Sequence, residues 1–137
     1  MNLFYHAIFL TSEDKYYLSS LMSSHIPNEW NMKCHHTTIA FHTDLDSSSA
    51  WTKTYFENWM QQNINQSVVL KATAIGFTEK AIALKIDMPS FPCLSGNPHL
   101  TIAVAPKCSA SASRAISIWT PLEAPINLIG IVGSTHK

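Results

Sequence analysis

The alternation of apolar and polar positions along the chain indicates a mixture of short strands and amphipathic helices. Residues 3–10 form an aromatic and aliphatic run typical of a strand. Thr11 follows, with a capping hydroxyl ahead of acidic residues in a first helical turn. The predicted strands are residues 3–10, 33–43, 67–77, 80–88, 99–105 and 126–132, and the predicted helices are residues 11–25 and 51–64. Six strands with two main helices predict an α+β fold.

Prolines and small polar residues mark the places where these elements end. They predict a hairpin turn at Thr78 and Glu79, loops at residues 44–49 and 89–98, a short helix within residues 109–119, and a loop framed by Pro121 and Pro125. None of these segments is long enough to act as a linker between domains. Residues 1–137 are therefore predicted to form a single domain.

The amino-acid composition and net charge indicate which classes of ligand or partner the protein can bind. Hydrophobic residues make up 46% of the 137 positions, which is enough for a core and argues against disorder. Nine basic and nine acidic residues give a formal net charge of zero, so a broad electrostatic grip on duplex DNA or long RNA is not expected. A small nucleotide or an RNA end needs only local positive charge and remains compatible with this balance.

The cysteines and the N-terminal residues indicate the cellular compartment in which the protein is expected. Three cysteines without a Cys-x-x-Cys pair argue against a disulfide framework and favour a reducing environment. The apolar N-terminal run lacks a basic leader, and no apolar stretch approaches the roughly 20 residues of a membrane span. We therefore expect a cytoplasmic protein that does not bind membranes, and we expect it to act as a monomer.

Two segments from different halves of the chain resemble each other. Residues 36–41 read His-Thr-Thr-Ile-Ala-Phe, and residues 99–104 read His-Leu-Thr-Ile-Ala-Val. Side chains two apart on a strand share a face, so His36 points with Thr38 and His99 points with Thr101. If the two strands are neighbours, these four polar side chains converge on one patch.

Such a patch suits hydrolysis of a phosphodiester without a metal ion. A neutral histidine takes a proton from water or a ribose hydroxyl, and a protonated histidine gives one to the leaving oxygen. The two threonine hydroxyls donate hydrogen bonds to the non-bridging phosphate oxygens, which positions the group and stabilises the developing charge. The assigned catalytic residues are His36, Thr38, His99 and Thr101.

The paired His-x-Thr strands resemble the 2H phosphoesterases, which include LigT-like RNA ligases/phosphodiesterases and the cyclic phosphodiesterase domains of tRNA ligases. Residues 97–104 and 125–130 are most similar to the tRNA-ligase branch. The resemblance implies two lobes related by a pseudo-two-fold axis, with antiparallel sheets lining a central cleft and helices outside. It also implies a hydrolase that needs no cofactor. The implied substrates are 2′,3′-cyclic phosphates, 2′–5′ linkages or cyclic dinucleotide signals, including those of immune signalling.

Other interpretations of the histidines remain open at this stage. His36 and His99 can be two structural strand residues, and the working pair can be His35 with Thr37 rather than His36 with Thr38. In the preferred frame, His35 lies on the opposite face and serves packing or the surface. A zinc site is the rival chemistry, because Cys34, His35, His36 and His42 are close in sequence.

Two further residues are candidates for substrate binding. Tyr5 lies in the first predicted strand and can stack on a base, although packing in the core or at its rim is the simpler explanation of an aromatic there. Lys107 follows the second motif and can meet a phosphate, although a solvated lysine is the simpler interpretation. A non-catalytic protein that sequesters nucleotides is the alternative to the phosphodiesterase.

Overall fold

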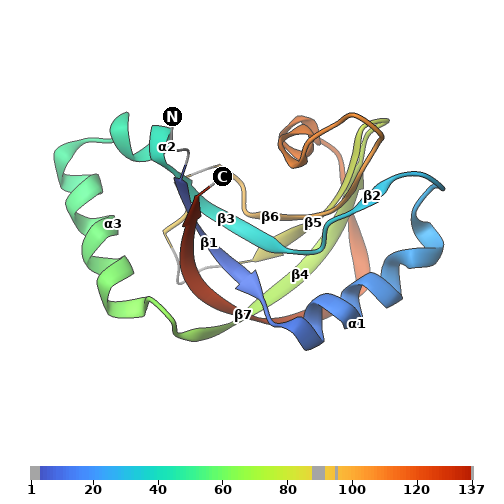
Figure 1. Cartoon of the computed structure of the whole chain (residues 1–137), viewed down its shortest axis with the longest axis horizontal. Coiled ribbons are helices and arrows are strands. Elements are labelled where there is room, and N and C mark those ends of the chain that lie inside the picture. The colour runs from blue at the N-terminus through green and yellow to red at the C-terminus, as the bar shows by residue number, and fades with distance from the viewer. Residues whose placement is uncertain (1–3, 88–91, 95, 137) are drawn as a thin grey trace.

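The protein folds around one closed sheet. The computed structural model describes residues 4–87, 92–94 and 96–136 (Figure 1). Its strands are β1 (Phe4–Leu10), β2 (Asn31–Met32), β3 (His36–Phe41), β4 (Ser67–Phe77), β5 (Ala81–Asp87), β6 (His99–Val104) and β7 (Trp119–His136). Its helices are α1 (Ser12–Met22), α2 (His42–Asp46) and α3 (Ala50–Asn63), with 3₁₀ turns η1 (Ser23–His25) and η2 (Ala110–Ala115).

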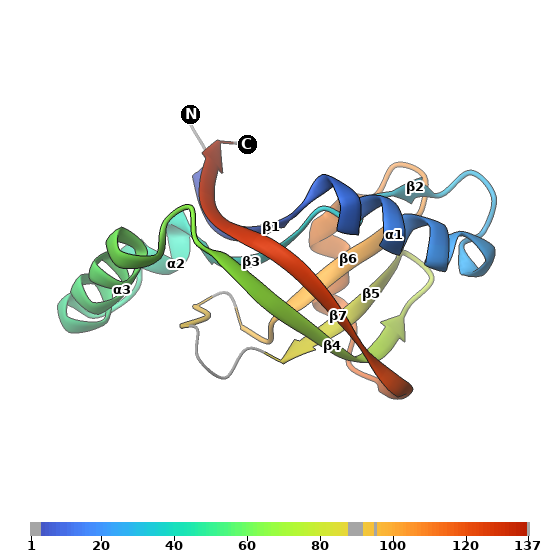
Figure 2. The same cartoon turned by 90° about the horizontal axis from the view of Figure 1, so that it is seen from below.

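The strands close into an antiparallel barrel. Their order is β2-β6-β3-β1-β7-β4-β5, and β5 also pairs with β6, which joins the two sides of the sheet. Six strands thus form the barrel, and β2 is an extra strand paired with β6. The predicted α+β fold of two lobes flanking a cleft is therefore wrong: both His-x-Thr strands belong to one barrel wall (Figure 2).

The long strand β7 is the main reason for this difference. Its 18 residues pair with β1 near its end and with β4 along most of its length, so one strand connects two sides of the barrel. Only residues 126–132 were predicted as strand, because Pro121 and Pro125 indicated a loop. The register shifts from Ile126 opposite Ala72 to Pro121 opposite Ala74, and the extra residues of β7 form an irregularity there. Prolines are tolerated in strands at such positions.

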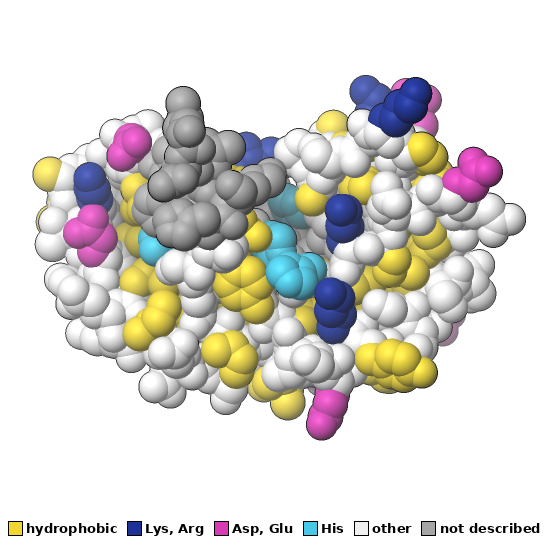
Figure 3. All heavy atoms as spheres, viewed as in Figure 1, with side chains coloured by type: hydrophobic (Ala, Val, Ile, Leu, Met, Phe, Trp, Pro, Cys, Tyr) yellow, Lys and Arg dark blue, Asp and Glu magenta, His cyan; other side chains and the backbone are white. Residues whose placement is uncertain are grey.

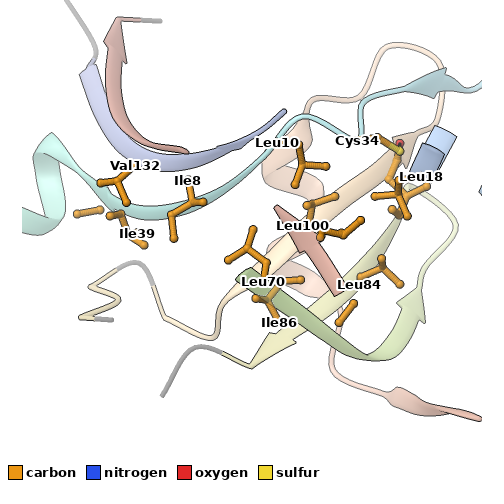
Figure 4. Close-up of a cluster of buried hydrophobic side chains, with 14 of the residues drawn as sticks. Ile8, Leu10, Leu18, Cys34, Ile39, Leu70, Leu84, Ile86, Leu100 and Val132 are labelled. Carbon is orange, nitrogen blue, oxygen red and sulfur yellow. Dashed lines mark hydrogen bonds between the residues drawn. The ribbon is translucent and has the colours of Figure 1, made fainter. Parts of the chain in front are cut away.

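Aliphatic side chains fill the barrel (Figure 4). Ile8, Leu70, Leu84, Leu100 and Leu128 are fully buried, and they come from five different strands. Leu84 and Leu100 lie opposite each other where β5 meets β6. Burial of each such side chain stabilises the fold by about 1.5–3 kcal/mol, so the seam is held by packing as well as by backbone hydrogen bonds.

The helices lie outside the barrel, with α1 and α3 on different sides of it (Figures 1 and 2). Helix α1 begins as predicted, because the Thr11 hydroxyl accepts a hydrogen bond from the Asp14 N–H at 3.3 Å. It buries Leu18 and Met22, whereas Tyr16, Tyr17 and Leu21 of the predicted apolar face are exposed. No helix in the described ranges combines the length and apolar character needed to cross a bilayer.

Helix α2 was predicted as the end of a strand and a loop. The Asp44 carboxylate accepts a hydrogen bond from the Phe41 N–H at 2.8 Å, which ends β3 and starts this helix. Helix α3 begins at a second capped position, where the Ser49 hydroxyl accepts from the Thr52 N–H, and it buries Phe56 and Met60. Helices α2 and α3 together carry the chain away from the end of the first motif strand.

Candidate active site

A pocket of about 560 Å³ lies over β1, β3 and β6, and α1 and η2 add to its walls. His36, Thr38, His99 and Thr101 all line it, so the structure brings together the four residues of the two motifs. Figure 3 shows histidine side chains in a hollow near the centre of this face, beside Lys and Arg side chains. The convergence expected from neighbouring strands is present, whereas the chemical roles of the four residues stay predictions.

The register of the strands explains the convergence. Thr37 of β3 lies opposite Leu100 of β6 in an antiparallel pair. Continuing this register by one residue in each direction places His36 opposite Thr101 and Thr38 opposite His99. Directly opposed residues on one face of an antiparallel pair have Cβ atoms about 4.5–5.5 Å apart. Each histidine therefore faces the threonine of the other motif.

Thr37 decides between the two possible frames of the first motif. Its side chain is fully buried with the core residues, and it does not line the pocket. A working pair of His35 and Thr37 would need the Thr37 hydroxyl in the pocket. The structure therefore favours the frame of His36 and Thr38.

His35 is placed differently from the prediction. It was expected on the face opposite His36, yet both side chains line the pocket. Cys34, just before them, has a positive φ of 49°, a conformation uncommon for residues other than glycine. Strand β3 begins only after this turn of the backbone, at His36, so the alternation of faces does not extend back to His35. This departure placed a third histidine in the pocket.

The two motif histidines have different partners at Nδ1. His99 Nδ1 lies 3.0 Å from the carbonyl oxygen of Asn97. A carbonyl oxygen can only accept, so His99 carries a proton on Nδ1 and presents Nε2 for proton transfer. His36 Nδ1 instead lies 2.9 Å from Nδ1 of His35. The first motif therefore has a titratable partner where the second has a backbone carbonyl.

Aromatic side chains support His36 from β1. The rings of Tyr5 and Phe9 lie 5.1 Å and 5.6 Å from the His36 ring, centre to centre. Tyr5 also lies 5.7 Å from Phe41 and lines the pocket, so its ring both packs and faces the cavity. Burial raises the pKa of the Tyr5 hydroxyl, which keeps it neutral. Stacking of Tyr5 on a base remains a prediction.

The turn η2 holds Thr101. The Thr101 hydroxyl lies 2.8 Å from the Ser113 hydroxyl, and Ser113 is almost fully buried. Each hydroxyl can donate only one proton. When Ser113 donates to Thr101, the Thr101 hydroxyl can donate either to the Ala110 carbonyl oxygen, at 3.5 Å, or to a ligand in the pocket. The contact of Ser113 with Thr101 was not predicted from the sequence, because the place of Ser113 depends on how the chain after β6 folds back.

Three cationic side chains line the pocket: Lys15 from α1, Lys33 from the segment before β3, and Arg114 from η2. Its described lining includes neither Asp nor Glu. The Arg114 guanidinium carbon lies 4.7 Å from the centre of the Phe41 ring, a cation–π contact between η2 and the end of β3. Lys107, the predicted phosphate contact, lies exposed in the turn after β6 and does not line the pocket. Lys107 lies close in sequence to the second motif, but it has a positive φ of 67° in this turn and its side chain lies outside the pocket.

Cys34, His35 and His36, three of the four candidate zinc ligands, are not gathered into one cluster, and the side chain of His42 lies outside the described residues. Cys34 is buried in the core, and burial raises the pKa of its thiol. Its sulfur lies 3.7 Å from the Ile102 carbonyl oxygen. In the part of the chain that the structure describes, no three His, Cys, Asp or Glu side chains are placed to hold a metal ion together.

Comparison with known proteins adds no family assignment. A scan against protein-family models and a search of curated proteins returned no match to this chain. The resemblance to 2H phosphoesterases therefore rests on the sequence segments described above.

Proposed function

We propose that this protein hydrolyses a phosphodiester at a ribose 2′ or 3′ oxygen by acid–base catalysis between His36 and His99. The observation that supports it best is that both His-x-Thr motifs, from opposite halves of the chain, line one pocket. A lone strand histidine is most often structural, but two histidines, each facing a threonine from the other motif, form a matched set for proton transfer.

The reaction divides among the four side chains. The neutral histidine takes a proton from water, whose oxygen attacks phosphorus, while the imidazolium gives a proton to the ribose oxygen as its bond to phosphorus breaks. Thr38 and Thr101 donate hydrogen bonds to the non-bridging oxygens, where charge develops. Each step uses only groups that line the pocket, and the proposed chemistry needs no metal ion.

The size and charge of the pocket favour a small anionic substrate. A cavity of about 560 Å³ is within the range that holds one small ligand, and Lys15, Lys33 and Arg114 offer positive charge on a chain of zero net charge. The proposed substrates are a cyclic di- or oligonucleotide signal, or a 2′,3′-cyclic phosphate at an RNA end.

Thr101→Val is expected to lower kcat by about 10²–10³-fold, because it removes one donor to the developing charge. Thr101→Ser keeps the hydroxyl and is expected to stay close to wild type. Ser113→Ala is the matched control, since it breaks the same 2.8 Å contact but leaves the Thr101 donor in place. Steady-state kinetics of the three variants checks this. Equal losses in Thr101→Val and Ser113→Ala would contradict a direct role of the Thr101 hydroxyl.

Arg114→Gln is expected to raise KM by about 10–100-fold, since a hydrogen bond to a charged group contributes about 1.5–3 kcal/mol. Lys107→Gln removes an exposed cation outside the pocket and is expected to leave KM unchanged. The measurement is the KM of wild type, Arg114→Gln and Lys107→Gln at two salt concentrations. A larger effect from Lys107 than from Arg114 would move the phosphate contact away from η2.

A nucleotide panel in EDTA tests the proposal. It holds 2′,3′-cyclic mononucleotides, cyclic dinucleotides of 3′–5′ and mixed linkage, and a 2′–5′ oligoadenylate, with products separated by chromatography and binding measured by calorimetry. Cleavage of one class is the expected result. Binding without cleavage would replace the enzyme with a sequestering protein, and neither binding nor cleavage would overturn both.

A further inference from the structure

The pairing of His35 with His36 restricts which protonation states of His36 are possible. The two Nδ1 atoms lie 2.9 Å apart, with ring centres at 5.1 Å and ring planes at 87°. A hydrogen bond at this distance needs a proton on one nitrogen and a lone pair on the other. Protons on both atoms repel, and so do two lone pairs. Two arrangements therefore remain, which differ in the donor.

Only one of these arrangements permits proton transfer by His36. If His36 Nδ1 donates, Nε2 either holds a lone pair and acts as a base, or carries a proton and acts as an acid. If His35 Nδ1 donates instead, His36 is neutral with its proton on Nε2. In that form Nε2 cannot accept a proton, and a neutral imidazole is a very weak acid. The working arrangement has His35 neutral and accepting.

We infer that His35 is a positioning residue, whose neutral imidazole accepts the Nδ1 proton of His36 and keeps His36 in the tautomer that transfers protons at Nε2. This role rests on the proposed function of His36. It gives the two motifs different support, because His99 meets the Asn97 carbonyl, which accepts at every pH, whereas His36 meets a side chain that can become protonated.

The surroundings of His35 favour its neutral form. The His35 side chain is exposed at the pocket, but partial desolvation of its ring, and then the charges of Lys15 and Lys33, lower the pKa of His35 below its ordinary value. From β1, the uncharged ring of Phe9 packs on it at 5.6 Å. The other charged or titratable groups that line the pocket, besides His36, are Tyr5, His99, Cys108 and Arg114, and no lining carboxylate in the described residues opposes this effect. His35 therefore stays neutral to a lower pH than an ordinary histidine.

The lowered pKa of His35 affects the pH profile of activity. As pH falls through the lowered pKa of His35, both of its ring nitrogens become donors, and it can no longer accept from His36. Activity should therefore fall more steeply on the acid side than the ionisation of one catalytic histidine would produce. A partner that accepts but does not titrate would remove this extra loss.

His35→Asn supplies such a partner, since the amide oxygen can take the place of Nδ1, while His35→Ala supplies none. His25→Asn, at an exposed histidine in η1, is the control. ¹⁵N nuclear magnetic resonance reads the His36 tautomer without substrate, and kinetics reads kcat, KM and the pH profile. We expect Nδ1-protonated His36 in wild type and His35→Asn, and loss of that preference in His35→Ala.

In kinetics, His35→Ala is expected to lower kcat by about 10-fold or more at neutral pH with little change in KM. His35→Asn is expected to stay near wild type and to retain activity to a lower pH. Wild-type His36 protonated on Nε2, or equal kcat and pH profiles for His35→Ala and His35→Asn, would overturn the inference. If wild type cleaves no nucleotide, the proposed function is wrong. The tautomer measurement still tests the pairing of His35 with His36, because it needs no substrate.

Discussion

His99→Ala is expected to lower kcat by about 10²–10⁴-fold, the usual contribution of a positioned acid or base, with a much smaller change in KM. His99 lies at the start of β6, and its side chain faces the pocket rather than the core. Strand β6 is paired with β5 beneath it, including Lys85 opposite His99, so the fold should tolerate the loss of the imidazole. The same result is expected for His36→Ala.

The measurement is kcat and KM under EDTA, with thermal unfolding of each variant as a check on folding. His25→Ala is the control, because His25 is exposed and does not line the pocket. A variant that unfolds like wild type and retains its kcat would identify His99 as a structural strand residue. An equal loss in His25→Ala would point to a general effect of removing histidines.

Leu84→Ala is expected to lower the free energy of unfolding by about 2–5 kcal/mol, the usual range for a buried leucine truncated to alanine. Leu84 is fully buried and lies opposite Leu100, where β5 meets β6 and closes the barrel. Truncation to alanine removes the isopropyl end of the side chain and leaves a cavity at the seam where β5 pairs with β6. Denaturant unfolding followed by circular dichroism measures the effect.

Leu21→Ala is the matched control for that substitution. Leu21 lies in α1 and is 43% exposed, so its truncation should change the free energy of unfolding by much less. Similar small changes for the two variants would show that the β5–β6 seam is not packed. In that case the closed barrel would be the wrong description of the sheet.

Local sequence signals predicted most of the elements. The capping hydroxyl of Thr11 and the apolar spacing after it place α1 correctly, and β1, β4, β5 and β6 lie within or close to their predicted ranges. These features depend on neighbours in sequence, so a single sequence contains them. The short helix α2 was not predicted. Its stabilising contact, from the Phe41 N–H to the Asp44 carboxylate, occurs in a polar segment whose composition is also typical of a loop.

The closure of the barrel could not be obtained in this way. It depends on pairing of β5 with β6 and on the continuity of β7 past Pro121, which occupies an irregular position opposite Ala74. Such pairings join residues far apart along the chain, and proline locally indicates a break. The expectation of two lobes came from the resemblance to a family, and the strand order overturns it.

The sequence predicted that the four motif residues would lie together, and it did not predict other residues that line the pocket. The period of two in each motif correctly placed His36 with Thr38 and His99 with Thr101, because both segments are regular strands. His35 was assigned to the wrong face because the positive φ of Cys34 interrupts that regularity. Arg114 was missed because the fold of η2, which brings it over Phe41, has no periodic signal.

The geometry also changes what the twin motifs imply. They lie on neighbouring strands of one barrel, with Thr37 opposite Leu100 between them. The two-fold relation between the motifs is therefore that of an antiparallel strand pair, and it does not require two similar lobes. It is broken at the histidines themselves, where His36 meets His35 and His99 meets the Asn97 carbonyl.

The most direct test of the account is single-turnover cleavage of a cyclic dinucleotide and a 2′,3′-cyclic mononucleotide in EDTA, by wild type and by the double variant His36→Ala/His99→Ala. We predict that wild type opens at least one of the two rings without metal ions, and that the folded double variant binds the same nucleotide without cleaving it. Cleavage by the folded double variant at the wild-type rate would contradict the account, because the reaction would then not depend on this pair of histidines.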